Sequence, residues 1–141
     1  MREPGDVFHL AIPVVDLAEA QHFYVDLLGC KLARTYGDRI TVDFFGDQLV
    51  CHLSEPDERA PDERGGDRPL SLYPRHFGVT FRAAEDFDAL YALVELRKVP
   101  VFSDLATRFE GLAEVHRTFV LQDPSDNLLE FKHYRDPRMM Y

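Results

Sequence analysis

The order of secondary-structure signals repeats along this chain, and that repetition limits the folds available to it. Each half opens with a short alternation of apolar and polar residues, at Phe8–Ile12 and again at His76–Phe81. Each half then shows helical apolar spacing, followed by further strand-like segments. Between them, a stretch rich in Pro, Asp, Glu, Arg and Gly is typical of an exposed connector. We therefore predict an α+β fold, one domain built from two βαβββ modules at about 7–53 and 76–134, joined by a linker over 54–75.

The first half carries clear local signals for a helix followed by strands. Asp16 precedes Glu19 by three residues, which is the spacing of an N-cap and its partner. The apolar helical spacing that follows stops at Gly29, a residue type common just after a helix. Strands are then expected at about 31–36, 40–45 and 48–53, with Gly46-Asp47 as the turn between the last two.

The second half repeats the pattern with weaker identity. Apolar residues at helical spacing predict a helix over 87–96. The later elements expected in order are a strand at 99–102, an irregular segment around 108–111, a strand at 118–122, a turn at 123–127 and a last strand at 128–133.

The charge balance restricts the partners of the chain. Its 25 acidic and 16 basic side chains give a net charge of -9, a field that repels phosphate backbones and anionic lipids. We expect no nucleic-acid or membrane partner. With no long apolar run and no signal peptide, we expect a cytoplasmic protein. Cys30 and Cys51 fit no metal or disulfide spacing and are expected to be reduced.

Alternation along the strands isolates a few polar groups opposite the apolar faces. Residues two apart in a strand share a face, so His9, His52, His76 and Glu130 each lie opposite the side that a helix should cover. If the two sheets curl toward each other, His9, His76 and Glu130 meet in one cleft with His52 beside them. Two imidazoles and one carboxylate suit iron, manganese, zinc or nickel and leave positions open for a substrate.

A structural role is the simpler interpretation for any one of these side chains alone. A single strand histidine is more often a hydrogen-bonded structural group than a ligand. Glu130 is more informative, because a carboxylate among apolar neighbours is costly to bury without a partner. His22 is expected to be solvated, and His116, His133 and Tyr134 are expected at the surface or near the site.

Four further side chains are candidates for contact with a substrate. Gln48 and Lys132 share the parity of the cleft residues, although a salt bridge from Lys132 to an acidic neighbour is an equal alternative. Arg108 and Phe109 lie in the irregular segment and are candidates for a lid. A nucleophilic role for Cys51 is disfavoured, because it faces away from Gln48.

The residues resemble the vicinal oxygen chelate superfamily, which includes glyoxalase I, fosfomycin and bleomycin resistance proteins and extradiol dioxygenases. The resemblance covers about 7–134. It implies paired βαβββ modules that form an open, cup-shaped mixed sheet around one divalent metal, commonly in a homodimer. By this similarity His9, His76 and Glu130 match the metal ligands, and His52 falls where the glyoxalase I branch has a glutamate. The motifs are Phe8-His9-Leu10-Ala11, Phe23-Tyr24, Leu28-Gly29, Asp123-Pro124 and Asn127-Leu128-Leu129-Glu130-Phe131.

Within that superfamily, the segment from Gly46 to His52 most resembles small single-domain proteins predicted to be extradiol-type dioxygenases. This favours iron(II), a small substrate chelated through two adjacent oxygens, and His52 as an acid or base rather than a ligand. One alternative is a glyoxalase-type isomerase or lyase with His52 as a fourth ligand to zinc or nickel. The other is a resistance-type protein that binds a drug without catalysis.

Overall fold

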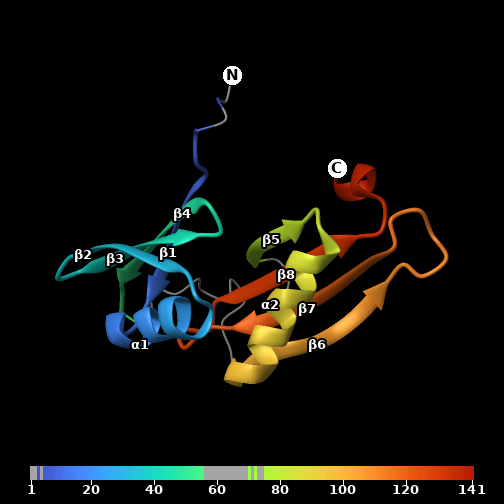
Figure 1. Cartoon of the computed structure of the whole chain (residues 1–141). Helices are drawn as coiled ribbons and strands as arrows, with labels where there is room; N and C mark the ends of the chain where they lie inside the picture. The colour runs from blue at the N-terminus through green and yellow to red at the C-terminus, as the bar shows by residue number, and fades with distance from the viewer. Residues whose placement is uncertain (1–2, 4, 56–69, 71, 73–74) are drawn as a thin grey trace, which may run out of the picture. The chain divides into compact units, whose positions relative to one another are not determined.

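The protein forms two compact units of similar topology, Met1–Pro69 and Leu70–Tyr141, and each is described by itself (Figure 1). The computed structural model describes residues 3, 5–55, 70, 72 and 75–141. Most of the expected linker therefore lies outside the described residues.

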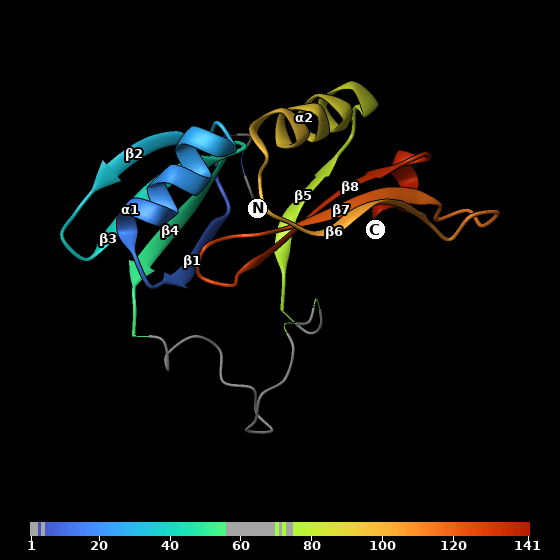
Figure 2. The same cartoon turned by 90° about the horizontal axis from the view of Figure 1, so that it is seen from below.

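The first unit is a four-stranded sheet with a helix on one face (Figure 2). The chain order is β1 (His9–Val14), α1 (Leu17–Gln21), a π-helical turn η1 (His22–Leu27), β2 (Lys31–Thr35), β3 (Arg39–Phe44) and β4 (Asp47–Leu53). The strand order in the sheet is β1-β4-β3-β2, with β1 parallel to β4 and the other pairs antiparallel. The predicted order of one strand, one helix and three strands is confirmed.

Local chemistry explains where these elements begin and turn. The Asp16 carboxylate accepts a hydrogen bond from the backbone N–H of Glu19 at 2.9 Å and caps α1, as predicted. The hairpin turn lies at Phe45-Gly46, one residue earlier than predicted, because Phe44 already pairs with Asp47. Phe45 and Gly46 have φ values of 53° and 96°, the positive values that a two-residue hairpin loop requires.

The second unit repeats this topology. Its elements are β5 (Phe77–Phe81), α2 (Ala84–Arg97), β6 (Val101–Arg108), β7 (His116–Gln122), β8 (Leu128–Tyr134) and a closing 3-10 turn η3 (Pro137–Met140). The sheet order is β5-β8-β7-β6, with β5 parallel to β8. In Figure 2, α2 lies over one face of this sheet. Side chains buried on that side include Phe87, Leu90, Val94, Phe119, Leu121, Leu129 and Phe131.

One strand is longer than the sequence predicts. β6 continues through Ser103 and Asp104 to Arg108, so the expected irregular segment is reduced to the turn that follows. β6 is the outer strand of its sheet and its pairing with β7 shifts register twice. An edge strand with such shifts tolerates polar residues, which obscured the alternation.

The turn that leads into β8 fixes the register of the strand carrying Glu130. Asp123 is buried, and its Oδ1 accepts hydrogen bonds from the backbone N–H groups of Ser125 and Asn127, both at 2.8 Å. Its Oδ2 accepts from the Asn127 side-chain amide at 2.8 Å. The prediction of a turn over 123–127 is confirmed.

Among the residues that the structure describes, no helix is both long and apolar enough to cross a membrane.

Candidate functional site

A polar cluster centred on Glu130 lies on the face of the second sheet opposite the apolar core. Leu129 and Phe131, the neighbours of Glu130 in β8, are fully buried, so Glu130 itself points to the other face. Its side chain is 10% exposed. A carboxylate this buried needs compensating contacts.

Three side chains supply those contacts. The Thr118 hydroxyl donates to Oε1 of Glu130 at 2.9 Å, and the Lys132 ammonium donates to Oε2 at 2.9 Å. Nε2 of His76 lies 3.2 Å from the same Oε2. Thr118 of β7 pairs directly with Lys132 of β8, and Lys132 is two residues from Glu130. The side chains of Thr118, Lys132 and Glu130 therefore share one face of the sheet. The predicted alternative of a salt bridge from Lys132 is confirmed.

The ring of His76 is held in a defined orientation just before β5. Its Nδ1 lies 2.8 Å from the backbone carbonyl of Leu72. A carbonyl oxygen only accepts, so Nδ1 carries the hydrogen and Nε2 of the neutral ring keeps its lone pair. The nitrogen that faces Glu130 is therefore the one able to bind a metal.

His9 of the first unit shows the same arrangement. It lies on β1 opposite Gln48 of β4, and its Nδ1 is 2.6 Å from Oε1 of Gln48. Because the amide oxygen accepts, Nε2 of His9 also carries the free lone pair of the neutral ring. Metal-binding histidines commonly have their second nitrogen fixed by an oxygen acceptor in this way.

The expectation that His52 lies beside His9 is wrong within the first unit. In the parallel pairing of β1 with β4, His9 faces Gln48 whereas His52 faces Pro13. His52 is four residues beyond Gln48, which corresponds to about 13 Å along a strand. One ion with ligand distances of about 2 Å does not reach imidazoles on both positions. Gln48, rather than His52, is the β4 residue next to His9.

The remaining candidates lie where β6 ends and β7 begins. Arg108 ends β6 and pairs with His116. Phe109, the first residue after β6, has a φ of 53° and is 56% exposed, and its ring centroid lies 5.6 Å from that of His116. His116, expected at the surface or near the site, is buried, and its ring centroid lies 4.5 Å from that of Tyr134. His116 lies two residues before Thr118 in β7, and this spacing was the sequence signal that could have placed it on the same face of the sheet as Thr118.

Other expectations about single residues are confirmed. His22 is exposed, and its ring nitrogen lies 3.0 Å from the carboxylate of Asp26. Cys30 and Cys51 are both buried, and neither forms a disulfide within the described residues. Burial, with a smaller contribution from the negative charge of Asp43, raises the pKa of the Cys30 thiol to about 12.

The donors around Glu130 fit one side of a metal site. Two ligand atoms, each about 2.1 Å from a divalent metal and at right angles, lie about 3 Å apart. Nε2 of His76 and Oε2 of Glu130 are 3.2 Å apart, which matches that separation. Within the described residues, no group of three or more His, Cys, Asp or Glu side chains is gathered closely enough to hold a metal.

Comparison with known proteins identifies related folds. A family model described as "Glyoxalase/Bleomycin resistance protein/Dioxygenase superfamily" matches residues 6–131. The chain is 63% identical to a glyoxalase/bleomycin resistance protein/dioxygenase from Alicyclobacillus acidocaldarius, whose crystal structure matches with a TM-score of 0.87 over 100% of both chains. No curated protein matches the chain.

More distant structures share the fold alone. A lactoylglutathione lyase from Agrobacterium tumefaciens is 20% identical, with a TM-score of 0.64 over 94% of this chain and 96% of that one. The fosfomycin resistance protein FosX from Listeria monocytogenes is 12% identical, with a TM-score of 0.65 over 96% and 98%. The predicted α+β fold of paired βαβββ modules is confirmed.

Proposed function

The chain belongs to the glyoxalase/bleomycin resistance protein/dioxygenase superfamily, and on that premise we propose that it is an enzyme in which His9, His76 and Glu130 bind one divalent metal. The observation that carries the proposal is shared by both histidines. Each has Nδ1 against an oxygen acceptor, at 2.6 Å for His9 and 2.8 Å for His76, so the lone pair of the neutral ring lies on Nε2. Glu130 supplies the carboxylate beside one of them.

Two imidazoles and one carboxylate are the ligand set typical of non-haem iron(II) oxygenases. We therefore favour iron(II) and dioxygenase-type chemistry on a small substrate, with manganese, zinc and nickel as alternatives. A metal bound there supplies Lewis-acid stabilisation to two adjacent substrate oxygens. The third ligand, His9, comes either from the same chain or from a second copy in a homodimer.

The remaining side chains have roles that follow from their contacts. Thr118 and Lys132 hold the Glu130 carboxylate through both of its oxygens and fix its direction. Gln48 fixes the His9 ring. His52, on the same face of β4 as Gln48 but four residues along, is suited to move a proton at the far end of a substrate. Its distance from His9 favours that role over a fourth ligand.

A glyoxalase-type isomerase or lyase is the second candidate, and it would need a fourth ligand beside His9, His76 and Glu130. The Gln48 side chain touches His9, so its amide oxygen is the nearest available fourth ligand if it turns away from Nδ1. In the observed geometry that oxygen accepts the His9 hydrogen bond. This arrangement supports the three-ligand set.

The homodimer also remains part of the proposal, and β6 supports it. β6 is the outer strand of its sheet and exposes Val101, Phe102 and Leu105. An edge strand with exposed apolar side chains is suited to pack against another chain. Light scattering after gel filtration tests this. A mass near twice 16.3 kDa supports the dimer, and a mass near 16.3 kDa contradicts it.

The function itself is tested by metal analysis and oxygen uptake on anaerobically purified protein. We expect stoichiometric iron in the wild type, its loss in Glu130→Gln, its retention in His52→Gln, and oxygen consumption with at least one of a panel of catechols. Zinc or nickel without oxygen uptake would instead support the isomerase or lyase. A wild-type protein that binds no stoichiometric metal would overturn the enzyme proposal and leave a drug-binding protein.

A further inference from the structure

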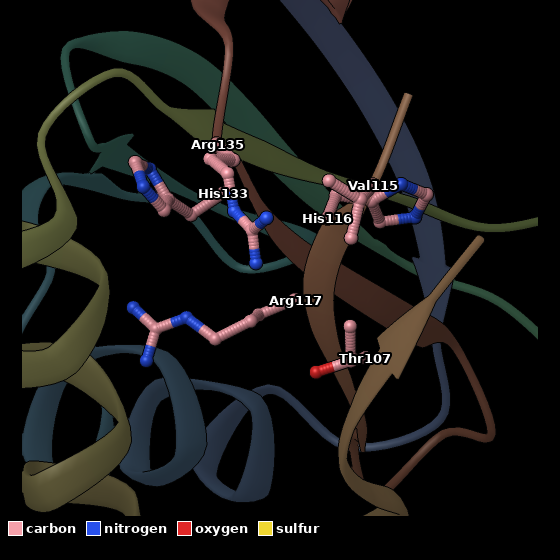
Figure 3. Close-up of a pocket in the computed structure, with 6 residues that line it drawn as sticks. All are labelled: Thr107, Val115, His116, Arg117, His133 and Arg135. Atoms are coloured by element: carbon pink, nitrogen blue, oxygen red, sulfur yellow. The ribbon is translucent and has the colours of Figure 1, made fainter. Parts of the chain in front are cut away.

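A pocket in the second unit lies apart from the Glu130 cluster and has no role in the proposed function (Figure 3). Its volume is about 260 Å³. Six residues from β6, β7, β8 and the adjoining turns line it, namely Thr107, Val115, His116, Arg117, His133 and Arg135.

Three polar residues that line the pocket form one row across the neighbouring strands β6, β7 and β8. Arg117 of β7 pairs directly with Thr107 of β6 on one side and with His133 of β8 on the other. Directly paired residues point to the same face of a sheet. That face is the one covered by α2, because Arg117 reaches Asp88 of α2. Glu130 lies on the opposite face, so the pocket is a separate site.

The charge of the pocket is opposite to that of the whole chain. The protein has a net charge of -9, yet the lining holds two guanidinium groups, two imidazoles and no carboxylate. In Figure 3 the side chains of Arg117, His133 and Arg135 gather on one side of the pocket, whereas the His116 ring points away from them. This concentration of donors favours a negatively charged ligand.

The side chains of the row are held in place by neighbours. Arg117 uses Nη1 to bind Asp88 at 2.8 Å and lies over the Phe87 ring at 4.8 Å, which leaves its other N–H donors for a ligand. The His133 ring is anchored by its Nδ1, which lies 3.2 Å from the Phe81 carbonyl. Within the described part of the chain, the guanidinium of Arg135 has no ion-pair partner. Its backbone N–H alone is engaged, with the Val115 carbonyl.

We propose that this pocket binds a small oxyanion, the phosphate or carboxylate group of a metabolite. Arg135 and Arg117 donate to its oxygens, because a guanidinium presents parallel N–H groups that match the spacing of such oxygens. The Thr107 hydroxyl, next to Arg117 in the row, supplies a neutral donor. The pocket admits a ligand of metabolite size rather than a nucleic acid, which the net charge disfavours.

The test is calorimetric titration with inorganic phosphate at fixed ionic strength, with acetate and chloride as parallel arms. We expect phosphate or acetate to bind, and Arg135→Gln to weaken that binding at least tenfold. The matched control is Arg138→Gln, which removes the same charge from an exposed residue that pairs with Asp136 outside the pocket. We expect less than a twofold change there. Thr107→Val should give a smaller loss without a change in charge.

A second titration separates this site from the metal site. In Glu130→Gln, which is designed to abolish the proposed metal binding, the anion should bind as in the wild type. Binding that disappears in Glu130→Gln but persists in Arg135→Gln would place the anion on the metal and overturn the proposal. Equal affinities in Arg135→Gln and Arg138→Gln, or no response to any oxyanion beyond that to chloride, would overturn it as well. Circular dichroism of each variant confirms that it is folded.

Discussion

Nε2 of His76 lies 3.2 Å from Oε2 of Glu130, and this pair of atoms is brought together by the parallel pairing of β5 with β8. The Nδ1 hydrogen bond to Leu72 leaves a lone pair on Nε2 of the neutral ring. A lone pair directed at a carboxylate is repulsive unless a cation or a proton lies between them. The geometry is thus that of two donors converging on a positive charge.

The first prediction concerns the carboxylate itself. Glu130→Gln keeps the shape of the side chain but removes the charge that a divalent metal needs. We expect metal affinity to fall by more than about 100-fold, since changes to groups that only support a ligand already cost 10–100-fold. Titration calorimetry on metal-free protein measures this. Glu110→Gln, an exposed glutamate in the turn after β6, is the control, and a similar loss there would contradict the assignment.

The second prediction concerns the group that orients His9. Gln48→Leu removes the oxygen that accepts from Nδ1 of His9 at 2.6 Å while keeping a side chain of similar size. The ring is then free to turn and to change tautomer, so metal affinity should fall about 10–100-fold. Gln122→Leu is the matched control, because the side-chain amide of Gln122 donates to Asp126 in the 123–127 turn of the second unit. Equal metal affinity in Gln48→Leu and wild type would remove His9 from the ligand set.

The third prediction separates the two possible roles of His52. Because β1 pairs with β4 so that Pro13, not His9, faces His52, we expect His52→Gln to bind metal within about twofold of the wild type. Turnover of an active substrate should fall about 100-fold or more, the usual contribution of a general acid or base. Metal loss in this variant, measured by elemental analysis, would show that His52 is a ligand after all.

The contrast between Gln48 and His52 shows what the sequence could and could not predict. Alternation is a property of one strand, so it correctly predicted that both side chains lie on the face of β4 opposite Leu49 and Cys51. The shift of β4 along β1 depends on turns and packing elsewhere, and no local pattern encodes it. The sequence therefore predicted the face but not which residue of β4 adjoins His9.

The same reasoning applies to the second unit. Glu130 and Lys132 share a strand, so their common face was predictable, and the contact with Thr118 follows once β7 and β8 pair. The ring contact of His116 with Phe109 follows a turn in which Phe109 has a positive φ that no residue preference indicates. Such a contact arises from tertiary packing alone.

The fourth prediction uses the close approach of β5 to β8. A Cβ added at Gly78 would overlap the backbone carbonyl oxygen of Glu130, its partner in the ladder. Backbone atoms in a paired strand have little room to move, so Gly78→Ala should destabilise the fold by about 1–3 kcal/mol. Gly37→Ala is the control, because a Cβ there meets no atom within 4 Å. Thermal unfolding followed by circular dichroism compares them, and equal midpoints would contradict the close contact.

The fifth prediction concerns pH and the buried thiol of Cys30. Burial raises its pKa from 9.0 to about 12 in the folded protein, with a smaller contribution from Asp43. Above pH 9 the unfolded chain loses this proton while the folded chain retains it, so stability falls as pH rises from 9 toward 12. The loss should reach about 2 kcal/mol by pH 10.5. Denaturant unfolding of wild type and Cys30→Ala at pH 8 and 10.5 measures the difference, because tyrosine and lysine ionisation is common to both. Parallel pH slopes in the two proteins would show that the Cys30 thiol ionises as readily when folded as when unfolded.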